Sequence, residues 1–365
     1  MSKALAVYAG KAALAQIQEQ GISQSQIQMM IGASGGPKWF VLAGLDRYFC
    51  SDFFKDRTAP IYTLGSSAGA WRFACYAQQD PLAAINRLIH GYSHMSYPAK
   101  ATIKQVTEQS EQLLTHILGS TKGTDIIQNP IFKSNIVVAK SLGLTRFEHK
   151  SLQLPGLLAS AIGNRLKRQH LGKFYQRVVF SADVNNIPFD YHDGINTSVV
   201  AFQQNNYQLA LQATGAIPLI INGVKDIPSA GAGMYRDGGI VDYHFDQQFL
   251  PVAQMPSLAA QPKSGLVLYP HFYNEFKPGW FDKYIKGRVA AKQHFDNVVV
   301  LAPTAEFVAR LPFGKIPDRK DFTQLSEAAR IKYWQTVVSE SERLADEFNE
   351  LVHSSKPAQH IQLMS

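Results

Sequence analysis

The chain has 365 residues, of which 45% are hydrophobic and 18% charged, and its 36 Lys and Arg residues against 28 Asp and Glu residues give a formal net charge of +8. These fractions, with ordinary numbers of Gly and Pro, exclude a disordered, collagen-like or coiled-coil chain and leave a globular protein with a large core. Two cysteines, Cys50 and Cys75, are too few for a disulfide framework or a four-ligand zinc site, so we expect a reduced, cytoplasmic protein without a bound metal.

The first twenty residues do not have the pattern of a signal peptide, because Lys11, Gln16 and Gln18 interrupt their apolar stretch. Residues 194–224 carry no charge, but Asn and Gln residues between 203 and 208 shorten the apolar run far below the ~20 residues that a membrane span requires. We therefore expect neither a signal peptide nor a transmembrane helix.

Short apolar runs alternate with helical patterns along the chain. The predicted strands are 27–31, 61–64, 136–139, 178–181, 199–202, 266–269 and 298–301. The predicted helices are 39–49, 70–77, 82–91, 101–117, 156–168 and 323–352. This alternation predicts an α/β fold with a mostly parallel central sheet that helices cover on both faces. We expect one domain over residues 1–320, and a C-terminal helix with a short tail, residues 321–365, that packs on the same domain.

The last predicted helix carries small and apolar side chains on one face: Val337, Ser341, Leu344, Ala345, Phe348 and Val352. Residues 321–352 hold seven acids and three bases, whereas residues 1–320 hold 32 bases and 21 acids, a net charge of +11. We expect this acidic helix to brace a basic domain.

Basic residues gather in two segments. Residues 150–181 contain no acid and six bases: Lys150, Arg165, Lys167, Arg168, Lys173 and Arg177. Residues 277–292 interleave five bases with aromatic residues: Lys277, Lys283, Lys286, Arg288 and Lys292 with Trp280, Phe281 and Tyr284. A solvated surface and a site for an anionic partner both fit this pattern. Because the chain has no zinc module and no RNA-reading signature, an anionic membrane surface is favoured over nucleic acid.

The predicted helix 156–168 lies in the first basic segment. Its apolar residues recur at near-helical spacing behind Pro155: Leu157, Leu158, Ala161, Ile162 and Leu166. The favoured interpretation is a core-facing helix with a cationic C-terminus, and the alternative is a membrane anchor. The alternative predicts vesicle binding that requires anionic lipid and weakens with salt.

The most informative segment is Gly65-Ser66-Ser67-Ala68-Gly69, between the strand 61–64 and the helix 70–77. G-x-S-x-G in this context is typical of a nucleophile elbow, a strained turn that exposes a serine hydroxyl at the carboxyl end of a sheet. Gly65 and Gly69 stand two residues either side of Ser67, so we predict that Ser67 is the nucleophile.

Gly32-Ala33-Ser34-Gly35-Gly36 has the same pattern after the strand 27–31. Pro37 and Lys38 follow and start a helix, an arrangement that suits an anion or oxyanion cradle of backbone N–H groups better than a nucleophile. Pro37 and Trp39 break the phosphate-loop pattern. A plain turn between strand and helix is the alternative.

A serine nucleophile needs a base. Among the eleven histidines, His271 at the end of the strand 266–269 is the best candidate and His244 the next. A stronger feature is Asp237-Gly238-Gly239, which places a carboxylate where the backbone turns tightly, although this tripeptide alone usually marks a turn.

Together these motifs resemble those of the patatin-like phospholipase family. The shared features are the Gly-Gly-x-Lys turn, G-x-S-x-G about thirty residues later, the segment 213–218 (Ala-Thr-Gly-Ala-Ile-Pro) and Asp-Gly-Gly, in family order over residues 32–239.

The resemblance implies a three-layer α/β fold and a Ser/Asp dyad without a catalytic histidine. Ser67 would be the nucleophile and Asp237 the base. The remaining implied roles are an oxyanion hole from the N–H groups of Gly35 and Gly36, a basic residue near it in Lys38, and support from Gly65, Gly69, Gly238 and Gly239. Two departures affect the geometry of the oxyanion hole and the substrate entrance: Ser34 replaces a glycine, and Trp39 replaces another.

The sequence therefore predicts a serine acyl hydrolase that cleaves lipid carboxylic esters, such as those of a phospholipid or lysophospholipid, through an acyl-enzyme and without a cofactor. We expect a cytoplasmic protein with peripheral contact to an anionic membrane surface and no nucleic-acid partner. The alternatives are a noncatalytic lipid- or membrane-binding protein that retains the fold, which the two departures motivate, and a Ser-His-Asp esterase that uses His271.

Overall fold

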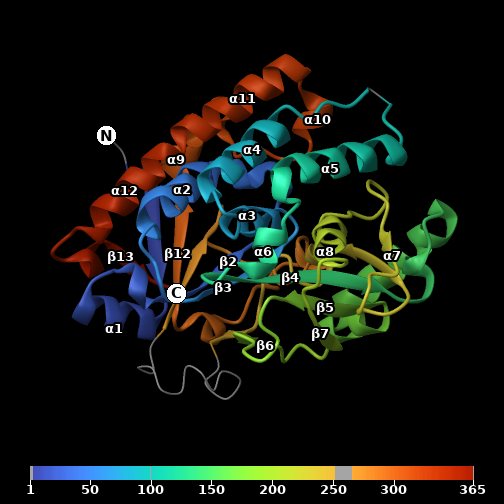
Figure 1. Ribbon diagram of the computed structural model, residues 1–365, viewed down its shortest axis with the longest axis horizontal. Helices are drawn as coiled ribbons and strands as arrows, with labels where there is room; N and C mark the ends of the chain where they lie inside the picture. Colours follow the sequence, from blue (N-terminus) through green and yellow to red (C-terminus); the bar gives the residue numbers. More distant parts are fainter. Residues whose placement is uncertain (1–2, 99, 251–264, 365) are drawn as a thin grey trace.

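The computed structural model describes residues 3–98, 100–250 and 265–364. Its central feature is a mostly parallel sheet with the strand order β13-β1-β12-β11-β2-β3-β4-β5-β7, in which β9 pairs with β4 and β8 (Figure 1). Its strands are β1 Leu5–Ala9, β2 Ile27–Gly32, β3 Ile61–Ser66, β4 Phe132–Ser141, β5 Tyr175–Ser181, β7 Thr197–Ala201, β8 Val224–Lys225, β9 Met234–Asp237, β11 Leu266–Pro270, β12 Val298–Pro303 and β13 Ile361–Leu363. β6 Phe189–Asp190 and β10 Gln248–Phe249 form a separate pair.

Helices flank this sheet, and α11 and α12 lie alongside α2 (Figure 1). The helices are α1 Lys11–Gln20, α2 Ala43–Tyr48, α3 Ala68–Tyr76, α4 Pro81–Ser93, α5 Ile103–Leu118, α6 Thr124–Gln128, α7 Lys150–Leu166, α8 Tyr207–Thr214, α9 Ala305–Arg310, α10 Asp321–Gln324, α11 Glu327–Glu340 and α12 Glu342–Val352. The predicted α/β architecture, with a mostly parallel sheet and a C-terminal helical segment, is confirmed. Among the described residues, none of the helices is both long and apolar enough to cross a membrane.

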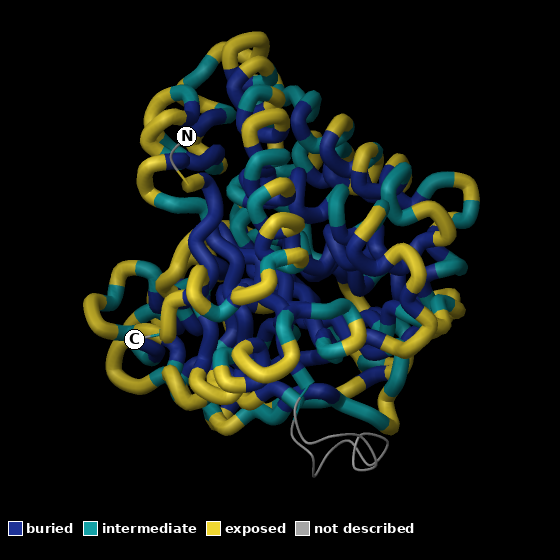
Figure 2. Tube along the Cα trace, turned by 90° about the vertical axis from the view of Figure 1, so that its left-hand side faces the viewer, coloured by how far each residue is buried: buried dark blue, intermediate teal, exposed yellow. Residues whose placement is uncertain are grey.

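The middle strands form the core. Every residue of β3 and of β11 is buried, which explains their mainly apolar sequences, because a parallel strand covered on both faces has no solvent side. Figure 2 shows buried segments running through the centre of the molecule, with the exposed segments mostly at its periphery. All seven predicted strands overlap observed strands.

Three predicted helices differ from the observed ones. The predicted helix 39–49 begins with a 3₁₀ turn, Gly36–Leu42, before α2. The predicted helix 323–352 is divided into α10, α11 and α12, and the break at Ser341 lets its hydroxyl accept a hydrogen bond from Gly44 N at 2.8 Å. The predicted helix 156–168 begins earlier, at Lys150, because one proline removes only a single backbone donor and the helix runs through Pro155.

Candidate active site

Ser67 lies between β3 and α3 in a strained backbone conformation. Its φ and ψ angles are 53° and −124°, a region that non-glycine residues rarely adopt. The turn is held by Thr214, whose hydroxyl accepts a hydrogen bond from Ser67 N at 2.9 Å and donates one to the Val137 carbonyl at 2.6 Å. Strand, turn and helix thus fix the direction of the Ser67 side chain.

The glycines of the G-x-S-x-G segment permit this close packing. A Cβ atom on Gly69 would overlap the carbonyl oxygen of Gly32 on the neighbouring strand β2. A Cβ atom on Gly65 would lie 2.5 Å from the Cα atom of Ala70. Neither position can hold a larger residue without moving α3 away from the sheet.

Strand β4 explains how Asp237 reaches Ser67 across 170 residues of sequence. Ser66 at the end of β3 pairs with Val137 of β4, and Asp237 at the end of β9 pairs with the next β4 residue, Val138. One strand therefore brings the ends of β3 and β9 together, end to end along β4. A Cβ atom on Gly238 would overlap the Val137 carbonyl, so glycine is required where the chain leaves β9.

The Ser67 hydroxyl donates a hydrogen bond to Oδ2 of Asp237 at 2.9 Å. The other carboxylate oxygen, Oδ1, accepts a hydrogen bond from Gly239 N at 2.7 Å. Burial raises the pKa of Asp237 above its ordinary value, against the opposing effect of these two hydrogen bonds and of the charges on Arg319 and Lys283. The carboxylate is thereby a stronger base than an exposed aspartate.

Ser34 in the other glycine turn is buried and lines the same inner cavity, but its hydroxyl does not bond to Asp237. Its hydroxyl shares a 2.8 Å hydrogen bond with the hydroxyl of Ser66, and its N–H donates to the Tyr243 carbonyl at 2.9 Å. A Cβ atom on Gly239 would lie 2.6 Å from the Ser34 hydroxyl. Ser34 therefore joins the two segments that carry Ser67 and Asp237.

Gly35 and Gly36 line a narrow inner cavity together with Ser67 and Asp237. Among the described residues, the N–H group of neither glycine donates a hydrogen bond. Trp39 is buried, with its ring centroid 4.6 Å from that of Phe40, so its side chain belongs to the core.

The sequence did not single out the cations that line this inner cavity, which are Lys283 and Arg319. Burial is the main cause that lowers the pKa of Lys283, to about 7. Lys38 is half-buried and is not among the lining residues; burial lowers its pKa also. Lys283 was visible only as one member of a basic segment, and Arg319 had no signal.

A larger cavity of about 570 Å³ opens from Ser67 and shares Gly36, Ile217 and Arg319 with the inner cavity. Its wall is mainly apolar and aromatic: Trp71, Tyr92, Met95, Tyr97, Val106, Ile217, Ile220, Ile221 and Phe322. The sequence did not predict Thr214 as a site residue. Thr214 and Ile217 belong to the segment 213–218, whose resemblance to Ala-Ser-x-Ala-Ile-Pro was the signal that could have identified Thr214. The cavity has room for an apolar chain next to the Ser67 hydroxyl.

His271 and His244 lie elsewhere. Nδ1 of His271 accepts a hydrogen bond from Tyr273 N at 2.9 Å, and the two imidazole rings are in contact, with centroids 4.4 Å apart. Burial lowers the pKa of His271 to about 3, so it stays neutral. Within the described part of the chain, neither histidine lines either cavity at Ser67.

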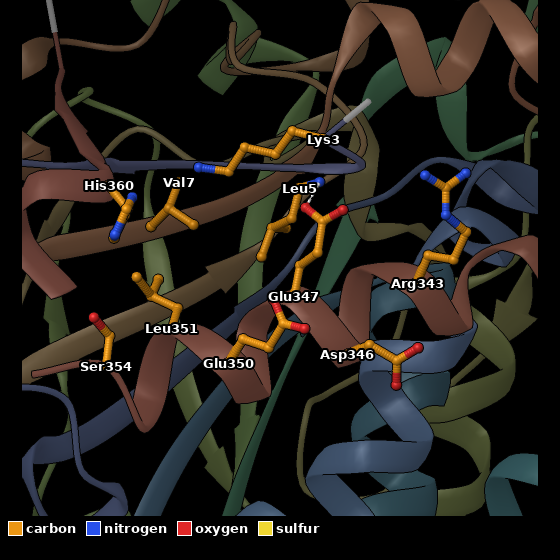
Figure 3. Close-up of a pocket in the computed structure, with 10 residues that line it drawn as sticks. All are labelled: Lys3, Leu5, Val7, Arg343, Asp346, Glu347, Glu350, Leu351, Ser354 and His360. Carbon is orange, nitrogen blue, oxygen red and sulfur yellow. Dashed lines mark hydrogen bonds between the residues drawn. The ribbon is translucent and has the colours of Figure 1, made fainter. Parts of the chain in front are cut away.

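Another cavity, of about 590 Å³, lies between β1 and α12 (Figure 3). The Glu347 carboxylate points at β1 and accepts hydrogen bonds from Ala4 N and Leu5 N at 2.7 and 2.8 Å. This cavity lies where α12 contacts the first strand, and the Glu347 carboxylate is already engaged in these two hydrogen bonds. Among the described residues, no group of three or more His, Cys, Asp and Glu side chains could hold a metal ion.

A scan of protein-family models found no match to the sequence, and a search of curated proteins found none either. Among solved structures, VipD from Legionella pneumophila is 13% identical with a TM-score of 0.30, over 73% of this chain and 53% of VipD. Human GIVD cytosolic phospholipase A2 is 8% identical with a TM-score of 0.35, over 96% of this chain and 65% of that one. The chain thus spans about half to two thirds of the structures it is similar to, and neither similarity is high enough to assign a family.

Proposed function

We propose that the protein is a serine acyl hydrolase that cleaves carboxylic esters of lipids, with Ser67 as the nucleophile and Asp237 as its base. The observation that supports this most directly is the 2.9 Å hydrogen bond between the Ser67 hydroxyl and the buried Asp237 carboxylate. It lies at a strained turn, beside a cavity with a mainly apolar wall.

In the first half-reaction, Asp237 accepts the Ser67 hydroxyl proton as Oγ attacks the ester carbonyl carbon. The N–H groups of Gly35 and Gly36 would stabilise the oxyanion, and in known enzymes one such donor contributes about 3 kcal/mol. The bond from carbon to the leaving oxygen then breaks, Asp237 returns the proton to that oxygen, and the acyl group remains on Ser67.

In the second half-reaction, Asp237 takes a proton from water as the water oxygen attacks the acyl carbon. The bond to Ser67 Oγ breaks, Ser67 regains its proton, and the carboxylic acid leaves. A carboxylate base suits an ester better than an amide, because an alkoxide leaving group needs less help from protonation than an amine.

Two features favour a phospholipid or lysophospholipid. The apolar wall of the larger cavity suits an acyl chain, and Lys283 and Arg319 place positive charge beside Ser67. A phosphate group next to the ester would complement that charge.

Labelling with a fluorophosphonate probe, followed by peptide mapping, tests the proposal. We expect the probe on the peptide that contains Ser67, no labelling of Ser67→Ala, and a loss of labelling rate in Asp237→Asn. Ser34→Ala is the matched control, because the Ser34 hydroxyl bonds to Ser66 and not to the Asp237 carboxylate; it should still label.

Three outcomes would contradict this assignment. Labelling on Ser34 would mean that the turn at Ser34, and not the turn at Ser67, carries the nucleophile. An inactive His271→Gln with an active Asp237→Asn would favour a Ser-His-Asp esterase. A folded protein that no probe labels would favour a noncatalytic lipid-binding protein.

A further inference from the structure

Helix α7 exposes its apolar side chains. Leu154, Leu158, Ile162 and Leu166, here called the apolar stripe, have exposed fractions of 51, 63, 53 and 75%. They are spaced four residues apart, so they follow one side of the helix. The interpretation of this segment as a core-facing helix is therefore wrong for most of its large apolar residues.

The opposite side of α7 is fixed against the protein by polar and small residues. Gln153 donates to the Phe147 carbonyl at 3.0 Å and accepts from Leu219 N at 3.1 Å, and Asn164 donates to Asp282 at 2.7 Å. The buried residues are Gln153, Gly156, Leu157, Ser160 and Asn164. Rolling the helix to bury the apolar stripe would break these hydrogen bonds, so the stripe is held outward.

The exposed charges beside the apolar stripe are cations. Arg168 and Arg177 are paired internally, with Asp282 and Asp242 respectively, and do not contribute to the surface. The exposed cations on or next to α7 are Arg146, Lys150, Arg165 and Lys167. Since residues 150–181 contain no acid, this helix presents leucine and isoleucine bordered by positive charge.

A neighbouring loop extends the same surface. Arg288 donates a hydrogen bond to the Asn164 carbonyl at 3.0 Å, which ties the loop to the end of α7. In this loop Tyr284 is 93% exposed, and Lys286 is exposed as well. Aromatic rings with nearby lysines are enriched where proteins meet a bilayer interface.

The first turns of α7 adjoin the cavity at Ser67. The hydrogen bond from Leu219 to Gln153 joins α7 to the segment 217–221, whose Ile217, Ile220 and Ile221 line that cavity. Figure 1 shows α7 projecting at the edge of the molecule, on the opposite side from β13.

We propose that the apolar stripe and its flanking cations dock the protein on an anionic lipid surface. The flanking cations favour an anionic lipid surface over a second copy of the chain. In a symmetric dimer the same cations of the two copies would face each other and repel. The docking does not rest on the proposed hydrolysis, so the failure of either proposal leaves the other standing.

The test uses the whole chain with Ser67→Ala, so that hydrolysis of the vesicle lipids cannot affect the binding measurement. Sedimentation with vesicles of phosphatidylcholine alone, or of phosphatidylcholine with phosphatidylserine added to supply negative surface charge, measures binding. We expect binding to the anionic vesicles that weakens as salt is raised, because screening shortens the reach of the cations.

Two pairs of variants separate the apolar and charge contributions. Leu158→Gln/Ile162→Gln should lower binding by about tenfold or more, because two side chains no longer enter the lipid. Its control is Leu363→Gln, an exposed residue on β13. Arg165→Gln/Lys167→Gln should lower binding by about tenfold, whereas Lys332→Gln/Lys356→Gln, with the same net charge, should not.

Equal binding to neutral vesicles at high salt, or equal binding by Leu158→Gln/Ile162→Gln and the parent protein, would overturn the proposal. Size-exclusion chromatography gives the other decisive result. A dimer that Leu158→Gln/Ile162→Gln converts to a monomer would assign the stripe to a second copy instead. Unchanged near-ultraviolet circular dichroism in each variant shows that the fold is kept.

Discussion

At the residue scale, Asp237 combines two opposing requirements. The proposed role as a base requires a sheltered carboxylate, yet burial disfavours the ionised form of Asp237 and raises its pKa. The folded state therefore retains the proton to a higher pH than the unfolded chain, whose aspartates titrate near ~3.9. The free energy of unfolding therefore falls as the pH rises from the pKa of the unfolded chain to the raised pKa of the folded state. At higher pH it stays lower by the same amount.

Replacing Asp237 with Asn removes the free-energy cost of burying an ionised carboxylate. We expect Asp237→Asn to unfold at a higher temperature than the wild type at neutral pH, with the difference shrinking as the pH falls toward ~4. Ester hydrolysis should fall by about 10²–10⁴-fold, the usual contribution of a general base. Thermal melts across pH and initial rates measure both. Asp346→Asn, on the exposed face of α12, serves as the control; an equal melting difference at every pH would contradict the prediction.

Lys283 predicts a pH-dependent substrate preference. Its pKa of about 7 means that its charge is present below neutral pH and lost above it. The preference, in kcat/KM, for a phospholipid over an uncharged ester should therefore fall by about tenfold as the pH rises through 7. Lys283→Arg should hold the preference constant, because arginine stays charged.

Lys320→Arg is the matched control, since Lys320 is exposed and lines neither cavity. It should keep the wild-type pH profile. If Lys283→Arg and the wild type lose their preference in parallel, Lys283 does not contact the phosphate.

At the element scale, a buried ion pair fixes the helix that follows Ser67. Arg72 of α3 donates to both carboxylate oxygens of Asp46 on α2, at 2.8 and 2.6 Å, and Tyr76 donates to the same carboxylate at 2.6 Å. Both charged side chains are almost completely buried. The orientation of α3, and with it the turn at Ser67, depends on this pair.

Arg72→Met should lower the free energy of unfolding by about 3–5 kcal/mol, because it leaves the Asp46 carboxylate buried without its cation. Arg47→Met breaks a partly exposed pair with Glu342 and should cost about 1 kcal/mol or less. Urea denaturation measures both. Equal losses in the two variants would show that burial of the Arg72 pair is not what anchors α3.

At the scale of the whole molecule, the two ends of the chain support each other. Glu347 of α12 binds the backbone of β1, and β13 pairs with β1 in parallel. Helices α11 and α12 bury Trp334, Val337, Leu344 and Phe348. The proposed domain 1–320 would expose the surface that these residues cover.

A chain that ends at residue 320 should therefore fail to fold cooperatively. Each of the four side chains contributes about 1.5–3 kcal/mol when buried, and together they rival the whole stability of a typical domain. A chain that ends at Ser354 keeps both helices and should fold with reduced stability. Near-ultraviolet circular dichroism and size-exclusion chromatography distinguish the two; a folded 1–320 chain would make the C-terminal helices dispensable.

Some features were missed because they depend on contacts rather than on pattern. Strand β13 has three residues, of which Gln362 and Leu363 are exposed, so it carries no local signal and is ordered by pairing with β1. Strand β1 and helices α1 and α8 were not predicted either. The periodicity of α7 was correct, but the side that is buried was not, because hydrogen bonds from Gln153 and Asn164 outweighed the apolar side chains.

The sequence by itself determined the α/β class, the positions of the middle strands and the two glycine turns, because continuous apolar runs and tight turns are local properties. Only the tertiary structure decided which serine faces a carboxylate, since the pairing of β4 with both β3 and β9 sets Asp237 beside Ser67 and leaves Ser34 bonded to Ser66. It also decided that Lys283 and Arg319 line the cavity and that the apolar stripe faces outward. Those outcomes depend on contacts between residues far apart in the chain, which no local pattern encodes.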